Sequence, residues 1–259
     1  MDLYELHSAM VHAVWVGNCS AVARLLSSGN SANKPIGRPG GTARWWLGTF
    51  PLIYFATQHG HREVVALLLD HEALVNAAQS ETGATALMLA SERNHLSIMS
   101  LLLDKGASVN QAALDGDTAL LAAIDNGHTE AVDLLLRRGA VVDLPNKNGK
   151  TALHGACHLE NEGAVRLLLA AGASTTLEDN QGHCAMDWAI APRQAAVREI
   201  LAPRGLPLEN EGAVRLLLAA GASTTLEDNQ GHCAMDWATA PRNAAVRHIL
   251  QQHMHAEEQ

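Results

Sequence analysis

The sequence predicts an all-α fold, a solenoid in which pairs of short helices stack on one another. A Thr-Ala-Leu motif recurs every 33 residues, at Thr85, Thr118 and Thr151. Runs of leucine end at a glycine with the same spacing, at Gly106, Gly139 and Gly172. A fixed period of roughly 20–50 residues is the sequence signature of a repeat protein.

Each unit contains two apolar segments with helical spacing. In the first segment, Thr118 to Asn126, the side chains of Leu120, Ala123 and Ile124 stand at i, i+3 and i+4 and therefore share one face of a helix. The second segment, 129–138, repeats this spacing. Neither helix can bury its apolar face alone, so the units must stack and share one elongated core.

The ends of these segments carry start and stop signals. Threonine stands where its hydroxyl can accept a free backbone N–H of the first helical turn. Glycine follows the second segment, where a helix commonly ends in the left-handed conformation. Between units, Asp115-Gly116 and Asn148-Gly149 can supply the positive φ of a tight hairpin turn. The sequence therefore predicts a hairpin "finger" between each helical pair and the next.

These residues resemble the ankyrin repeat, whose 33-residue unit has the signature T-P-L-H-x-A. The closest matches are the segment Thr151 to Ala156, which reads TALHGA, and the second-helix stretch 127–136. The resemblance implies a curved stack with hairpin fingers, inner helices on the concave side, and a role in binding proteins. One helix alanine recurs through nearly the whole chain, at Ala13, Ala56, Ala90, Ala123, Ala156, Ala189 and Ala238.

The chain departs from a regular array in two places, its first finger and a duplicated block. We expect repeats over residues 1–201, with an atypical N-terminal repeat at about 3–33 and a first finger at 30–51 that is ten residues too long. A duplicated partial repeat and a terminal cap repeat occupy 209–250, and 251–259 form a tail. Counting the caps, this layout predicts about six to seven repeats.

The duplication is nearly perfect. Residues 159–201 and 208–250 match at 40 of 43 positions, which indicates a recent internal duplication or an error in the gene model. The copied block begins with a second helix, so two second-type helices, about 193–201 and 209–219, follow each other across a junction at 202–208. Prolines in this junction would remove backbone donors from a helix. We therefore expect a break or kink in the solenoid there.

Charge and cysteine content exclude several classes of function. The formal net charge is −9; four basic against two acidic residues make the first fifty positions +2, which leaves −11 for the remainder. A nucleic-acid partner is not expected, because its binding normally needs a basic face. The cysteines show neither a CxxC pair nor zinc spacing: Cys19, Cys157, Cys184 and Cys233.

The N-terminus and the hydropathy pattern indicate a location. Asp2 and Glu5 stand where a signal peptide would be basic, and no apolar run approaches the roughly 18 residues of a membrane span. We therefore expect a monomeric protein of the cytoplasm or nucleus, with reduced thiols and no membrane segment.

Some residues invite a catalytic or metal interpretation. His154 and Cys157 lie three apart on one predicted helix with His158 adjacent, which could place a base beside a nucleophile. No third orienting group or oxyanion-forming glycine turn accompanies them, so we expect structural roles, no catalytic residue, no metal and no cofactor. Other histidines occupy one recurring position of the repeat, just before the second helix begins: His61, His95 and His128.

The late fingers and the cap repeats offer weaker signals. Glu178-Asp179 and Glu227-Asp228 make two fingers acidic, and such charges are usually solvated. Acting together, they would favour a basic partner, chiefly by raising the association rate. The duplicated Trp188 and Trp237 are expected to pack in the core or cap, with partner binding as the alternative.

The long first finger is the predicted site of partner binding. Its glycines and prolines predict a loop, which has little core of its own in which to bury two adjacent tryptophans. Tryptophan and arginine are enriched at the centres of protein interfaces. The tryptophans could instead cover the first repeat as an N-terminal lid. The predicted surface joins the finger to the next helix and comprises Arg44, Trp45, Trp46, Tyr54, Phe55, Gln58 and His59.

The predicted function is a non-catalytic protein-interaction module that binds a partner protein through the concave face and fingers, as an adaptor or inhibitor. The alternative is a substrate-recruiting subunit of a multi-chain enzyme such as a ubiquitin ligase, in which the catalytic activity belongs to another chain.

Overall fold

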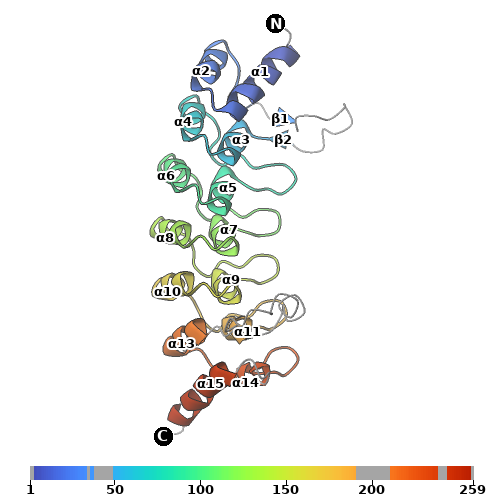
Figure 1. Ribbon diagram of the computed structural model, residues 1–259. Helices are drawn as coiled ribbons and strands as arrows, with labels where there is room; N and C mark the ends of the chain where they lie inside the picture. Colours follow the sequence, from blue (N-terminus) through green and yellow to red (C-terminus); the bar gives the residue numbers. More distant parts are fainter. Residues whose placement is uncertain (1–2, 34–35, 38–48, 191–210, 239–243, 258–259) are drawn as a thin grey trace, which may run out of the picture. The chain divides into compact units, whose positions relative to one another are not determined.

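A computed structural model describes residues 3–33, 36–37, 49–190, 211–238 and 244–257 (Figure 1). The chain divides into two compact units, residues 1–141 and 142–259. Across the described residues the helices form seven pairs, four in the first unit and three in the second. The prediction of an all-α stack of helical pairs is confirmed.

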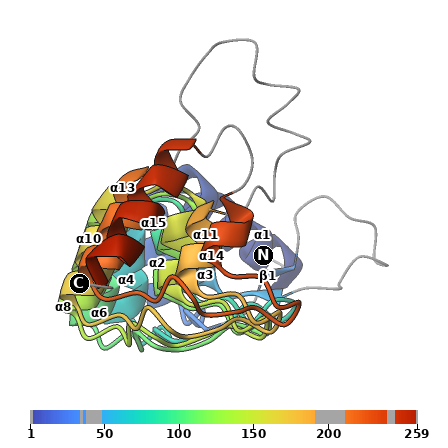
Figure 2. The ribbon, with the colours of Figure 1, turned by 90° about the horizontal axis from the view of Figure 1, so that it is seen from below.

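The first unit consists of two columns of helices (Figure 1). In one column α1, α3, α5 and α7 pack successively, and in the other α2, α4, α6 and α8 do so. The connections between pairs run along one edge of these helices (Figure 2). The helices are α1 (Leu3–Val16), α2 (Cys19–Ser27), α3 (Leu52–Gln58), α4 (Arg62–Asp70), α5 (Ala86–Glu92), α6 (Leu96–Asp104), α7 (Ala119–Asp125) and α8 (Thr129–Arg137).

The second unit repeats this arrangement. Helices α9, α11 and α14 pack in one column, and α10, α13 and α15 in the other. The helices are α9 (Ala152–His158), α10 (Glu162–Ala170), α11 (Ala185–Ile190), α13 (Glu211–Ala219), α14 (Ala234–Trp237) and α15 (Ala244–Glu257). Helix α15 continues to Glu257, so much of the predicted tail is helical.

The predicted capping residues hold the helix starts. The hydroxyls of Thr85 and Thr118 accept the backbone N–H groups of Met88 and Leu121 at 3.4 and 3.3 Å. Gly139 follows α8 with φ of 86°, a left-handed conformation that is costly for residues with a Cβ. Because these contacts are local, the sequence could place the helices to within about two residues.

The first finger begins and ends as a short β-hairpin. Strand β1 (Ile36–Gly37) pairs antiparallel with β2 (Thr49–Phe50), so that Ile36 lies opposite Phe50. The loop predicted for this finger is thus tied together at its base. Its tip, residues 38–48, lies outside the described residues.

Polar side chains tie each helical pair to the next. In the first unit, the side-chain amide oxygens of Asn33, Asn76 and Asn110 accept the backbone N–H groups of Leu74, Ser108 and Val141 at 2.7, 2.8 and 2.8 Å. His61 and His128 each place Nε2 2.9 Å from a carbonyl oxygen of the preceding pair, at Trp15 and Glu92. These two histidines therefore have the structural role predicted from their position in the repeat.

The break or kink expected at the junction 202–208 lies outside the described residues, whereas the helices on either side of it are described. Helix α13 packs against α10 and α11 and carries α15 on its far side, so the described helices continue one stack. Inside a stack a helix needs apolar positions toward both neighbours. Helix α13 repeats the sequence of α10 and buries Ala213, Val214, Leu217 and Leu218.

Candidate functional site

Four of the seven predicted binding residues share one face of α3. Tyr54, Phe55, Gln58 and His59 stand at i, i+1, i+4 and i+5, and all four are partly or fully exposed. The opposite face forms the core and consists of Leu52, Ile53, Ala56 and Thr57, each no more than 2% exposed. The other three predicted residues, Arg44, Trp45 and Trp46, lie outside the described residues.

The aromatic rings on and beside α3 contact one another. The ring of Phe50 lies 5.7 Å from that of Tyr54, and the ring of Phe55 meets His59 edge-on at 4.8 Å between centroids. His59 in turn stacks on His61 at 6.0 Å. The rings stiffen a surface that is otherwise open to solvent, which lowers the entropy lost when a partner binds.

Two exposed apolar residues at the end of α1 extend this surface. Trp15 and Val16 are 54% and 58% exposed, and the backbone carbonyl of Trp15 contacts His61 Nε2. The sequence analysis missed them, although a signal was present. Trp15 and Val16 follow the repeat alanine of α1 by two and three residues, as Gln58 and His59 follow that of α3.

The same two positions are exposed on α5 and α7, where they are polar. We call this set of eight residues the inner strip. It comprises Trp15 and Val16 of α1, the last residues of α3, α5 and α7 (Gln58, Glu92 and Asp125), and the residue that caps each of these three helices (His59, Arg93 and Asn126). Along the first unit the strip changes from apolar, through neutral and aromatic, to charged.

Electrostatics keep Tyr54 and His59, the titratable groups of the α3 surface, uncharged at neutral pH. Burial raises the pKa of Tyr54, and the carboxylate of Glu92 raises it further against the opposing effect of Arg93. Burial also lowers the pKa of His59, as do the nearby His61 and Arg93. Tyrosine and histidine shifted in these directions are both neutral at pH 7.

Comparison with known proteins decides the family. The family model described as "Ankyrin repeats (3 copies)" matches residues 9–113 and 120–209. The chain belongs to the ankyrin-repeat family. A search of curated proteins found no match.

Two solved ankyrin repeat domains are similar to this ankyrin-repeat protein. The ankyrin repeat domain of Bcl-3, described as a unique member of the IkappaB protein family, is 26% identical with a TM-score of 0.72, covering 94% of this chain and 97% of that one. An ankyrin repeat domain from Acinetobacter baumannii AYE is 27% identical with a TM-score of 0.67, covering 78% and 96%. Ankyrin repeat domains are generally protein-interaction modules. Among the described residues, no helix combines the length and apolar character needed to cross a membrane.

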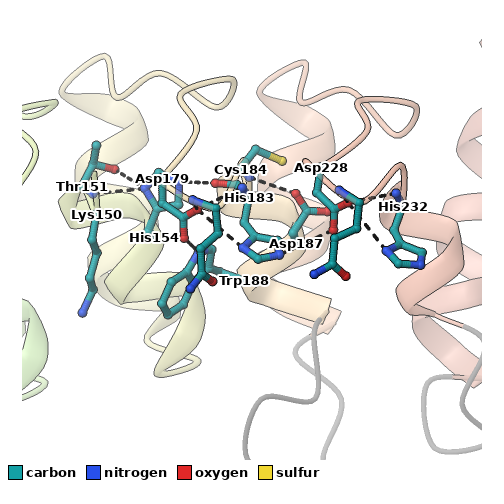
Figure 3. A network of polar contacts seen from close by, with 12 residues as sticks. Lys150, Thr151, His154, Asp179, His183, Cys184, Asp187, Trp188, Asp228 and His232 are labelled. Atoms are coloured by element: carbon teal, nitrogen blue, oxygen red, sulfur yellow. Dashed lines mark hydrogen bonds and ion pairs between the residues drawn. The ribbon is translucent and has the colours of Figure 1, made fainter. Parts of the chain in front are cut away.

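The histidine that matches the ankyrin signature has a structural environment. His154 is 1% exposed, its Nδ1 accepts the backbone N–H of Thr151 at 3.1 Å, and its Nε2 lies 3.1 Å from the carbonyl oxygen of His183 (Figure 3). Burial lowers its pKa. Because both ring nitrogens are engaged within the repeats, neither faces a site where a substrate could receive or give a proton.

The neighbouring thiols are equally unsuited to nucleophilic chemistry. Burial raises the pKa of Cys157 far above its usual range, and burial with Asp187 raises that of Cys184 to about 12. A thiol must ionise to attack, so both remain inert near neutral pH. Within the described part of the chain, no group of three or more His, Cys, Asp or Glu side chains could hold a metal ion.

Two of the acidic finger residues are buried, although the sequence predicts solvated charges. Asp179 and Asp228 are only 9% and 6% exposed, and each Oδ1 accepts two backbone N–H groups of its own turn at 2.8–3.0 Å. Burial alone raises both pKa values, but these hydrogen bonds, the Trp188 N–H at Asp179 and the nearby histidines together lower them. These two carboxylates therefore brace the fingers, and only Glu178 and Glu227 of the predicted acidic pairs face solvent.

The duplicated tryptophans pack against the same fingers. Trp188 is half-buried; its Nε1 donates to Asp179 Oδ2 at 3.0 Å, and its ring lies 5.1 Å from that of His158. Trp237 lies 5.1 Å from His232, the copy of His183. The packing predicted for both tryptophans agrees with these contacts.

Proposed function

We propose that this ankyrin-repeat protein is a non-catalytic interaction module that binds a partner protein through the inner strip, as an adaptor or inhibitor. The observation that carries the proposal is the exposed pair Trp15 and Val16, continuous with the ring cluster of α3. The similarity to the Bcl-3 ankyrin domain supports it. The predicted finger residues Arg44, Trp45 and Trp46 belong to the same proposal.

The arrangement has the physical character of a protein-binding surface. Tryptophan is enriched among residues whose truncation costs about 2 kcal/mol or more of binding free energy. An exposed tryptophan supported by ordered rings buries a large apolar area and loses little side-chain entropy on binding. The strip needs no catalytic chemistry for this role, because it offers an apolar end, a neutral ring cluster on α3 and exposed charges on α5 and α7.

The test is quantitative affinity purification from cells with three proteins: the wild type, Trp15→Ala and Leu114→Ala. Leu114 is a matched control, because it lies on a finger of the first unit and is 58% exposed, close to the 54% of Trp15. The His61 contact uses the backbone of Trp15 and survives the substitution.

We expect at least one partner to be lost with Trp15→Ala and retained with Leu114→Ala, at unchanged melting temperature. Equal partner profiles for all three proteins would refute the proposal. A ubiquitin-ligase core among the Trp15-dependent partners would favour the substrate-recruiting alternative.

A further inference from the structure

Two neighbouring fingers of the second unit meet at a histidine that lies between two carboxylates. The preceding finger, residues 171–184, leads from α10 to α11, and the last finger, residues 220–233, leads from α13 to α14. We propose that His183 makes the joint between them a pH-sensitive switch. Its protonated ring holds the last finger against the preceding one, and loss of the proton releases the last finger.

Both ring nitrogens of His183 face carboxylate oxygens. Nδ1 lies 3.5 Å from Asp179 Oδ1 in the same finger, and Nε2 lies 3.5 Å from Asp228 Oδ2 in the last finger (Figure 3). A neutral imidazole carries one N–H group, whereas the protonated ring carries two. Only the protonated ring can therefore present a donor to both fingers at once.

The carboxylate of Asp228 depends on this neighbour. Its side chain is 0% exposed, and no described group forms a hydrogen bond with its Oδ2. The matching oxygen one finger earlier, Asp179 Oδ2, accepts the indole N–H of Trp188 at 3.0 Å. A buried charge is costly unless it is paired, so loss of the positive charge on His183 destabilises the closed joint.

Other titratable groups surround His183 in the folded chain. They are Asp179 of its own finger, Asp187 of α11, His154 of α9, Asp228 and His232 of the last finger, and Asp236 of α14. The pKa values of Asp179 and Asp228 are lowered, so both carboxylates are ionised near neutral pH. His154 contacts the backbone carbonyl of His183, not its ring.

The direction of the switch follows from histidine chemistry. The charge of a histidine side chain changes between about pH 5 and 8, so the joint is closed on the acidic side and opens as the pH rises. One repeat earlier, Lys150 occupies the position of His183. A lysine keeps its charge throughout this range, so His183→Lys should hold the joint closed.

The experiment measures hydrogen exchange of the full chain by mass spectrometry at about pH 5.5 and about pH 8, corrected for the intrinsic pH dependence of exchange. It follows the last finger, where the N–H groups of Gln230 and His232 donate to Asp228 Oδ1. Because the two fingers have the same sequence, peptides that extend to Ile190 or Thr239 tell them apart.

We expect corrected exchange in the last finger of the wild type to be about tenfold faster at the higher pH. His183→Lys should exchange slowly at both pH values, and His183→Ala should exchange fast at both. His232→Ala is the matched control and should respond as the wild type does, because the His232 side chain is 46% exposed and contacts Asp228 only within its own finger.

Equal corrected exchange of the wild type at the two pH values would overturn the inference. A pH response of His183→Lys as large as that of the wild type, or loss of the response in His232→Ala, would also overturn it. Circular dichroism at both pH values checks that each variant is folded. If His183→Lys does not fold, Asp228→Asn takes its place: without the buried charge the pH response should disappear, and a retained response would refute the switch.

Discussion

The duplicated fingers of the second unit contain a natural pair for testing stability. Asp179 and His183 of one finger recur as Asp228 and His232 in the next. His183 Nε2 lies 3.5 Å from Asp228 Oδ2, so it joins one finger to the following one, while its Nδ1 lies 3.5 Å from Asp179 (Figure 3). His232 has the corresponding contact to Asp228 within its own finger, at 3.6 Å.

Replacing His183 with alanine should therefore cost more than the same change at His232. The His183 side chain is 11% exposed and that of Asp228 is 0% exposed, and no described group forms a hydrogen bond with Asp228 Oδ2. Leaving a buried polar group without its neighbour costs about 1–3 kcal/mol, and because this one is a carboxylate we expect about 2–3 kcal/mol. The His232 side chain is 46% exposed, which predicts a cost of about 0–1 kcal/mol.

The assay is urea denaturation at pH 7 followed by far-ultraviolet circular dichroism, with His183→Ala, His232→Ala and the wild type measured together. The hydrogen bond from His154 ends on the backbone of His183 and remains in the variant, so it does not contribute to the difference. Equal shifts of the unfolding midpoint for the two variants would refute the reasoning. It would mean that the contact between fingers adds nothing beyond the contact within one finger.

Three further predictions concern substitutions at Asn76, at the two finger aspartates and at the tip of the first finger. Asn76→Ala removes the acceptor of the Ser108 N–H and a donor to the Ser108 hydroxyl, and should lower the free energy of unfolding by about 1 kcal/mol in denaturant titrations. The lowered pKa values of Asp179 and Asp228 mean that their stabilisation is present above the unfolded pKa of about 3.9 and is lost as pH falls through the folded values. Asp179→Asn/Asp228→Asn should flatten the loss of stability below about pH 4, and an unchanged slope would contradict this assignment; Asp187, whose pKa burial raises, contributes with the opposite sign. Trp45→Ala/Trp46→Ala should abolish partner binding without lowering the melting temperature, whereas a lowered melting temperature with intact binding would leave the finger only as a lid.

The sequence by itself determined the repeat and its local geometry. The predicted segments 118–126 and 129–138 became α7 and α8, because capping threonines, turn glycines and apolar spacing act within a few residues of one another. The same spacing assigned Tyr54, Phe55, Gln58 and His59 to one helix face. The repeat alignment also places Trp15 and Val16 at the positions of Gln58 and His59, so it could have predicted that these two residues are exposed.

Only the tertiary structure decided the features that depend on which distant segments meet. Helix α13 pairs with α11, and this pairing depends on its contacts with α10 and α15, which no local pattern encodes. Asp179 and Asp228 have the sequence of solvated finger charges, yet their burial follows from the packing of successive fingers. Helical periodicity shows which side of a helix is apolar, whereas the neighbours that cover it are set by contacts between residues far apart in the chain.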